Sequence, residues 1–206
     1  MKIKQLESIL KAQKTIIVSE TPECQWLGDG ASLYPVYNLP KLTRDNIFTM
    51  FDVAEDKRDK FYFQERPLPE SYNFGDADES EQLIERGKLT ICTHGRVLEP
   101  LKTSQGIAFI NIRYLKPFAD TEAGYELYER IDTYGKPYIV VKSGFILLGV
   151  IIPYDLVSKD FIEQLEELLS LSRVALFNKQ QHKADGEAEQ LTIDTPEETE
   201  ADNVRT

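Results

Sequence analysis

Cysteine and histidine are scarce in this sequence of 206 residues. The two cysteines, Cys24 and Cys92, are too few for a disulfide framework or a four-ligand zinc site, and they do not form a Cys-x-x-Cys pair. No other ligand-rich cluster accompanies them. We therefore expect free thiols, no metal centre and no cofactor.

A nucleophile paired with a base is also hard to find. His94 follows Cys92 by two residues. On a strand, such residues share a face without the orientation that a nucleophile and its base require. The sequence therefore favours a protein that is not an enzyme and has no catalytic residues. The alternative that stays open is an unrecognised site that uses Asp29 and His94.

Long apolar runs are missing as well. No run approaches the roughly 18 to 20 residues that a helix needs to cross a bilayer. The lysine-bearing start lacks the continuous apolar stretch of a signal peptide. We therefore expect a cytoplasmic protein that has no membrane partner.

Positive charge is in deficit, because 24 basic residues stand against 35 acidic ones and the net charge is −11. Residues 185–206 hold eight carboxylates and one arginine, a net charge of −7, which leaves −4 for residues 1–184. Ordering the backbone costs about 1–2 kcal/mol per residue, which so polar a segment cannot offset. We expect a disordered acidic tail at 179–206. Its apolar interruption is loosely similar to peptides that dock on bacterial sliding clamps, which makes Gln190, Leu191 and Ile193 candidate partner-binding residues.

The rest of the chain has enough apolar residues for a core, since 41% of the whole sequence is hydrophobic. The spacing of these residues predicts an α+β fold of antiparallel sheets with short amphipathic helices. Prolines and acids between Pro67 and Glu81 interrupt the pattern. We expect an N-terminal α+β unit at 1–66, an acidic loop or linker at 67–87 and a C-terminal α+β unit at 88–178.

Individual elements follow from periodicity, capping residues and turns. Thr43 and Ser158 are expected N-caps, and Gly28-Asp29-Gly30 reads as a hairpin turn. Helices are expected at 3–13, 44–53, from about 111, and at 158–171. Strands are expected at 15–20, 25–27, 33–37, 60–65, 88–93, 96–101, from 106, and at 125–131, 137–142, 145–152 and 174–177.

Several residues are candidates for binding. Cations on the first and third expected helices can form a face for nucleic acid, although such charge is also typical of a solvated helix surface; these are Lys4, Lys11, Lys14, Arg113 and Lys116. Trp26 is either core or a partner contact. Asp29 lies in a turn that can also cradle phosphate.

Four acids form the remaining candidate cluster: Asp76, Asp78, Glu79 and Glu81. They can present negative charge to a partner, or they can be a solvated linker without the ligand order of a calcium loop. We include all four as candidate partner-binding residues.

One part of the chain resembles a known family. Residues 109–116 (Phe-Ile-Asn-Ile-Arg-Tyr-Leu-Lys), the expected strands at 125–131 and 137–141, and Val150-Ile151-Ile152-Pro153 together resemble the closing segment of a DNA sliding clamp. In that family a helix of the type Asn-x-x-Tyr-Leu precedes antiparallel strands with an aliphatic-aliphatic-Pro ending. The chain is shorter than a clamp ring requires, so this resemblance implies a homo-oligomer. Residues 26–40 also look like uncharacterised proteins of prophages and mobile elements in Gram-positive bacteria.

These observations favour one functional hypothesis. It is a non-enzymatic binding protein of a phage or mobile element, clamp-like in fold, that engages replication, repair or defence machinery through protein contacts. The alternative is an acidic DNA mimic that inhibits a host nuclease or defence complex, because rows of carboxylates can occupy phosphate-binding clefts. Direct binding of nucleic acid is left open.

Overall fold

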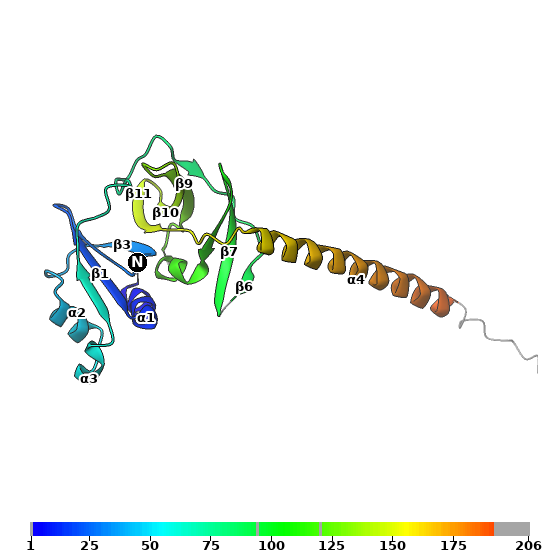
Figure 1. Ribbon diagram of the computed structural model, residues 1–206, viewed down its shortest axis with the longest axis horizontal. Helices are drawn as coiled ribbons and strands as arrows, with labels where there is room; N and C mark the ends of the chain where they lie inside the picture. Colours follow the sequence, from blue (N-terminus) through cyan, green and yellow to red (C-terminus); the bar gives the residue numbers. More distant parts are fainter. Residues whose placement is uncertain (1, 94, 120, 192–206) are drawn as a thin grey trace, which may run out of the picture. The chain divides into compact units, whose positions relative to one another are not determined.

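The computed structural model of the chain describes residues 2–93, 95–119 and 121–191 (Figure 1). Residues Met1–Asp155 form one compact unit, here called the body, and Leu156–Thr206 form a second. The fold is α+β, with a large and mostly antiparallel sheet and several short helices. Among the described residues, no helix has the length and the apolar character that crossing a membrane requires.

The large sheet of the described body has eight strands in the order β4-β1-β2-β3-β11-β10-β9-β5. Neighbouring strands are antiparallel except β1 and β4, which are parallel. The strands are β1 (Thr15–Glu20), β2 (Gln25–Gly28), β3 (Ser32–Val36), β4 (Tyr62–Glu65), β5 (Gln82–Leu83), β9 (Glu126–Ile131), β10 (Pro137–Ser143) and β11 (Ile146–Ile151).

The pairing of β3 with β11 joins segments that are distant in the sequence. Leu33 lies opposite Val150, and Ser32 lies opposite Ile151. Strands from the expected N-terminal unit at 1–66 and the expected C-terminal unit at 88–178 therefore belong to one sheet. The structure divides the chain after Asp155 instead. The physical reason is that both sets of strands bury the same apolar faces.

The segment 67–87, expected as a linker, packs against this sheet. Leu68, Tyr72 and Phe74 contact a cluster of buried side chains, and the Phe74 ring lies 5.0 Å from the Trp26 ring, centroid to centroid. Gln82–Leu83 adds the edge strand β5. The prolines and acids of this segment mark its turns, while three apolar side chains between them anchor it to the body.

Both faces of the large sheet are buried. Successive side chains of a strand point to opposite faces. Leu27 and Val141 accordingly join the larger core cluster, whereas Trp26 and Val140 join the smaller one. Burial on both sides explains why β10 and β11 read as nearly continuous apolar runs rather than alternating ones.

The larger cluster is covered by short helices and a second sheet. Leu6, Ile9 and Leu10 of the first helix are buried in or beside it, and so are Ile47 and Phe48 of the second. Thr43 caps the second helix as expected, with a reciprocal hydrogen bond from its own amide to the Asn46 side chain. The helices are α1 (Ile3–Gln13), α2 (Arg44–Met50), α3 (Glu55–Arg58) and the 3₁₀ helix η1 (Ile112–Phe118). The second sheet, in the order β6-β7-β8, contains β6 (Ile91–Thr93), β7 (Arg96–Thr103) and β8 (Gly106–Asn111).

The second unit is described as one long helix, α4 (Lys159–Leu191), drawn without a break in Figure 1. Ser158 caps it, because its hydroxyl accepts a hydrogen bond from the Phe161 amide at 3.2 Å. The helix continues through 174–177, where the sequence predicts a strand, and through 179–191, where it predicts disorder. Residues 172–181 contain no proline or glycine, so nothing in them stops a helix that has already begun. Residues 192–206 lie outside the described part.

Two buried cations share one carboxylate inside the body. The Arg130 side chain is fully buried and donates to Glu81 Oε2 through Nε at 2.8 Å and through its terminal nitrogen at 2.5 Å. Lys142, whose side chain is 6% exposed, donates to Glu81 Oε1 at 2.5 Å. Glu81 therefore neutralises charge that the surrounding core cannot solvate.

We predict that Glu81→Ala lowers the free energy of unfolding by about 3–5 kcal/mol, because it leaves two buried cations uncompensated. The matched control is Glu79→Ala, which removes the same charge from an exposed neighbour and should change stability by less than about 0.5 kcal/mol. Urea denaturation of both variants measures the difference. Equal losses in the two variants would contradict the assignment.

Candidate functional site

The short helix η1 carries the cations around which the candidate site is built. Asn111 caps it, because its Oδ1 accepts a hydrogen bond from the Arg113 amide at 3.1 Å. Tyr114, Leu115 and Phe118 are buried and fix the helix to the core. Gly149 of β11 permits this close approach, since an added Cβ there would lie 2.9 Å from Phe118 Cζ.

Tyr114 adds a polar anchor to the same helix. Its hydroxyl donates to Asp29 Oδ2 at 2.9 Å, and its backbone oxygen accepts from the Tyr34 hydroxyl at 2.9 Å. Burial, with a further contribution from the Asp29 carboxylate, raises the pKa of Tyr114 far above its ordinary value. The hydroxyl therefore stays protonated and keeps donating at any physiological pH. With its buried side fixed in this way, η1 presents Arg113 and Lys116 toward solvent.

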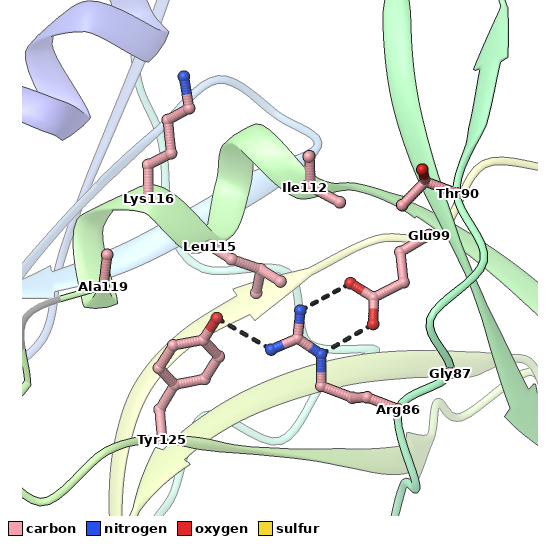
Figure 2. Close-up of a pocket in the computed structure, with 9 residues that line it drawn as sticks. All are labelled: Arg86, Gly87, Thr90, Glu99, Ile112, Leu115, Lys116, Ala119 and Tyr125. Carbon is pink, nitrogen blue, oxygen red and sulfur yellow. Dashed lines mark hydrogen bonds and ion pairs between the residues drawn. The ribbon is translucent and has the colours of Figure 1, made fainter. Parts of the chain in front are cut away.

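A pocket beside η1, here called the Arg86 pocket, has a volume of about 510 Å³. Figure 2 shows the Arg86 guanidinium near its centre, the Leu115 side chain close by, and Lys116 extending away from the other side of η1. The pocket is lined by Arg86, Gly87, Thr90, Glu99, Ile112, Leu115, Lys116, Ala119 and Tyr125.

Arg86 is held in place by a two-point ion pair. Its Nε and one terminal nitrogen donate to the two oxygens of Glu99 at 2.8 and 2.7 Å, and the other terminal nitrogen donates to the Tyr125 hydroxyl at 3.0 Å (Figure 2). The bond to Glu99 raises the pKa of Arg86, so its charge is permanent. Both Glu99 oxygens are engaged, whereas the Arg86 side chain is 38% exposed. A guanidinium has five N–H donors, so two of them stay available to a ligand.

A second pocket, here called the α1 groove, lies on the other side of Lys116 and has a volume of about 280 Å³. It shares Ile112 and Lys116 with the Arg86 pocket. Three cations line it and no carboxylate does. Its lining residues are Gln5, Ser8, Ile9, Ala12, Gly95, Arg96, Val97, Asn111, Ile112, Arg113 and Lys116.

Asn111, which lines the α1 groove, has a buried hydrogen-bond donor without a partner. The residue is 3% exposed, and its side-chain Nδ2 has no hydrogen-bond partner. A buried donor without a partner costs roughly 1–3 kcal/mol, so each such group calls for an explanation. An acceptor atom of a ligand bound in the groove would supply the missing partner.

Together the two pockets form what we call the basic site, defined by Arg86, Arg96, Arg113 and Lys116. The one carboxylate in their lining, Glu99, is already paired with Arg86. Four cations thus line two pockets that share Ile112 and Lys116, in a protein whose net charge is −11. Such an arrangement attracts anions locally even when the whole molecule is acidic.

Of the five cations of the expected nucleic-acid face, two line the pockets of the basic site and three do not. Arg113 and Lys116 both belong to the basic site. Lys11 forms an ion pair with Glu7 at 2.6 Å, and Lys4 and Lys14 are exposed on or beside α1 without lining either pocket. Ser8 of the groove lies four residues after Lys4 and three before Lys11, so both lysines lie beside the groove on α1 without lining it.

The sequence did not single out Arg86 and Arg96. Arg86 lies in the expected linker, where its backbone forms a bridge with Leu101 of β7, and Arg96 begins β7. Both reach η1 only through long-range packing. The one local signal at Arg96 is its position directly after Gly95 in the expected hairpin turn.

Trp26 is part of the core, since it is 4% exposed and packs edge-on against Phe74. Asp29 forms a hairpin turn, as the glycines around it predict. Its Oδ1 accepts hydrogen bonds from the amides of Ala31 and Ser32 at 3.1 and 2.9 Å, and its Oδ2 accepts from Tyr114. These bonds occupy its carboxylate within the fold.

Three of the four acids in the expected acidic cluster have partners inside the protein. Glu81 pairs with Arg130 and Lys142. Asp78 Oδ1 accepts from the amide and hydroxyl of Ser80 at 2.8 and 2.6 Å. Asp76 accepts from the Leu147 amide at 2.8 Å, whereas Glu79 is exposed. The cluster therefore contributes mainly to the structure of the segment 67–87.

The remaining candidates lie at the end of the chain or in the turn before Arg96. Gln190 and Leu191 end α4, and their side chains are not described; Ile193 and His94 lie outside the described residues. Cys24 and Cys92 are free thiols. Within the described part of the chain, no group of three or more His, Cys, Asp or Glu side chains could hold a metal ion.

Comparisons with known proteins give no family for this chain. No family model, no curated protein and no solved structure matches it. The resemblance to sliding clamps and to prophage proteins thus stays a prediction from the sequence, and the functional argument depends on the site itself.

We predict that Arg86→Ala destabilises the protein by about 2–3 kcal/mol at neutral pH, because Glu99 is left buried without its cation. The exposure of Arg86 makes this loss smaller than that of a fully buried pair. Urea denaturation at neutral pH measures the loss.

The matched control is Lys116→Ala, which removes an exposed cation from the same pocket and should change stability by less than about 0.5 kcal/mol. An Arg86→Ala variant as stable as this control would show that Glu99 does not depend on Arg86.

Proposed function

We propose that the protein is a non-enzymatic binding protein that holds the phosphate groups of a nucleic acid at the basic site. The observation that carries the proposal is the convergence of Arg86, Arg96, Arg113 and Lys116 around two adjoining pockets with a single, already paired carboxylate. Arg96, Arg113 and Lys116 line the α1 groove with no carboxylate among its lining residues, so they repel each other, and an anionic ligand relieves that repulsion.

The donor set suits phosphate in particular. Three of the four cations are arginines, whose planar guanidinium matches phosphate oxygens with two parallel hydrogen bonds. Asn111 adds the buried amide donor described above. Two adjoining pockets that share Lys116 suit a ligand with repeated phosphates, which favours a nucleic acid backbone over a single phosphate ion.

The charge of the whole molecule limits how strongly such a ligand binds. Residues 1–184 carry a net charge of −4, so phosphate is repelled from most of the surface. We therefore expect weak binding with a steep salt dependence, because each phosphate contact releases a counterion. Selectivity for base sequence is not part of the proposal.

One sequence resemblance agrees with this function, because a clamp-like closing segment implies a surface near DNA. The resemblance of residues 26–40 to prophage proteins gives a context without a mechanism. The alternative of a DNA mimic has less support, since Asp76, Asp78 and Glu81 are engaged within the fold.

We predict that fluorescence anisotropy detects binding of labelled duplex and single-stranded DNA at low salt. Arg113→Glu combined with Lys116→Glu should abolish it. Arg113→Ala alone should lower the slope of log affinity against log salt by about 0.9 for duplex DNA, the value for one lost phosphate contact. The control is Lys57→Glu combined with Lys60→Glu, which makes the same charge change at exposed positions in and just after α3.

Three outcomes would contradict the proposal. The wild-type protein fails to bind DNA, the control variant loses as much affinity as the site variant, or inorganic phosphate displaces DNA at concentrations that barely change the ionic strength. The last result would assign the basic site to a small phosphate ligand instead.

A further inference from the structure

The helix α4 exposes a continuous apolar stripe. Residues seven apart on a helix lie within about 20° of each other, so a seven-residue repeat marks one face. Three such rows lie next to each other: Phe161, Leu168 and Ala175; Ile162, Leu169 and Leu176; and Leu165 with Ser172.

This stripe is open to solvent in the chain as described. Its isoleucine and leucines are between 39% and 60% exposed. From Phe161 to Leu176 the stripe is about 24 Å long at 1.5 Å per residue. A heptad stripe of this kind is typical of a helix that packs against another helix.

Charged residues beside the stripe indicate what covers it. Glu166 and Arg173, one heptad apart, lie on the same flank, and each is exposed. Between residues 159 and 170 the helix carries four acids and Lys159, a net charge of −3, whereas between 171 and 181 it carries Arg173, Lys179 and no acid. Over this part of α4 a reversed copy of the helix is therefore complementary in charge, and the acids Asp185, Glu187 and Glu189 lie beyond it.

We propose that α4 pairs antiparallel with α4 of a second copy of this chain. With the two-fold axis between Ser170 and Leu171, Leu165 lies level with Leu176 of the partner subunit, and Leu169 lies level with Ser172 of the partner subunit. Glu166 then lies within one turn of Arg173 of the partner subunit on the same flank. Because the pair has two-fold symmetry, this ion pair occurs twice.

The opposite orientation is disfavoured by size and by charge. In a parallel pair in register the two-fold axis runs along the helices, so the flank with Glu166 and Arg173 faces the opposite flank of the partner helix and their ion pair does not form. Lys179, one heptad after Ser172 of the stripe, then meets its own copy. The bulky start of the stripe, with Phe161, would also meet its own copy, while Ser172 and Ala175 would leave gaps. Reversal places Leu169 level with Ser172 of the partner subunit, a large residue against a small one, which fills the interface more evenly.

The pairing is independent of the basic site, because α4 belongs to the second unit and the basic site to the body. The stripe covers little more than two heptads, so the association should be weak and depend on concentration. Sedimentation velocity of the full chain over a wide concentration range measures it. A monomer at every concentration would overturn the proposal.

Variants of exposed residues keep the test separate from folding. Leu169→Asp places a charge in the stripe and should weaken association at least tenfold. Val174→Asp places the same charge on the opposite face of α4 at a site that is also exposed, and it should leave association unchanged. Equal effects of the two variants would overturn the assignment of the face.

Charge reversal tests the orientation. Glu166→Arg or Arg173→Glu alone should weaken association and make it improve with added salt, because like charges then meet across the pair. The double variant, Glu166→Arg with Arg173→Glu, should recover the wild-type association. Failure to recover would contradict the antiparallel ion pair.

A distance measurement gives a second view of the orientation. Electron spin resonance would use Lys159→Cys, with Cys24→Ser and Cys92→Ser to remove the native thiols. The antiparallel pair predicts about 35 Å between the two labelled positions, whereas a parallel pair predicts about 10 Å. A short distance would overturn the proposed arrangement.

Discussion

The pairing of β3 with β11 is the constraint on which the rest of the body depends. It joins Leu33 to Val150 and thereby makes one sheet from strands at the two ends of the body. Once the sheet is continuous, both of its faces can be buried, with α1, α2 and η1 on one side and the segment around Phe74 on the other. Tyr34 of β3 then meets η1 through its hydrogen bond to the Tyr114 carbonyl.

The basic site depends on this arrangement because one side of η1 is buried in the core while its cations lie at the surface. Tyr114, Leu115 and Phe118 anchor η1 in the core. On the same helix Arg113 is half-buried and Lys116 is exposed. Arg86 comes from the segment 67–87 and is fixed by Glu99 and Tyr125. Arg86 is thus held in place before a ligand binds, which lowers the ordering cost of binding.

Local features of the fold could be predicted from the sequence, whereas long-range features could not. The hairpin around Asp29, the Thr43 cap and the change from strand to helix near Asn111 all depend on neighbouring residues. The shared sheet depends on β3 meeting β11, which no local pattern encodes. A local pattern can also mislead. The short apolar run from Val174 to Phe177 suggests a strand, whereas these residues continue the helix α4.

The same distinction between local and long-range features applies to the residues of the candidate site. Arg113 and Lys116 could be predicted because they share one short helix with a visible apolar side. Arg86 and Arg96 could not, because only the packing of β7 and of the segment 67–87 brings them to that helix. Trp26 was a candidate because tryptophan is common at interfaces, and Glu81 because it belongs to a cluster of acids that can present negative charge. Their burial became visible only with the sheet and with Arg130 in place.

The central claim is that phosphate groups bind where Asn111 leaves a buried donor without a partner. The most direct measurement is a nuclear magnetic resonance titration of the ¹⁵N-labelled protein with a short DNA duplex at low salt. The account predicts that the side-chain amide signal of Asn111 and the backbone amides of Arg96 and Arg113 shift together. Shifts confined to other parts of the body, with the Asn111 side-chain signal unchanged, would contradict it.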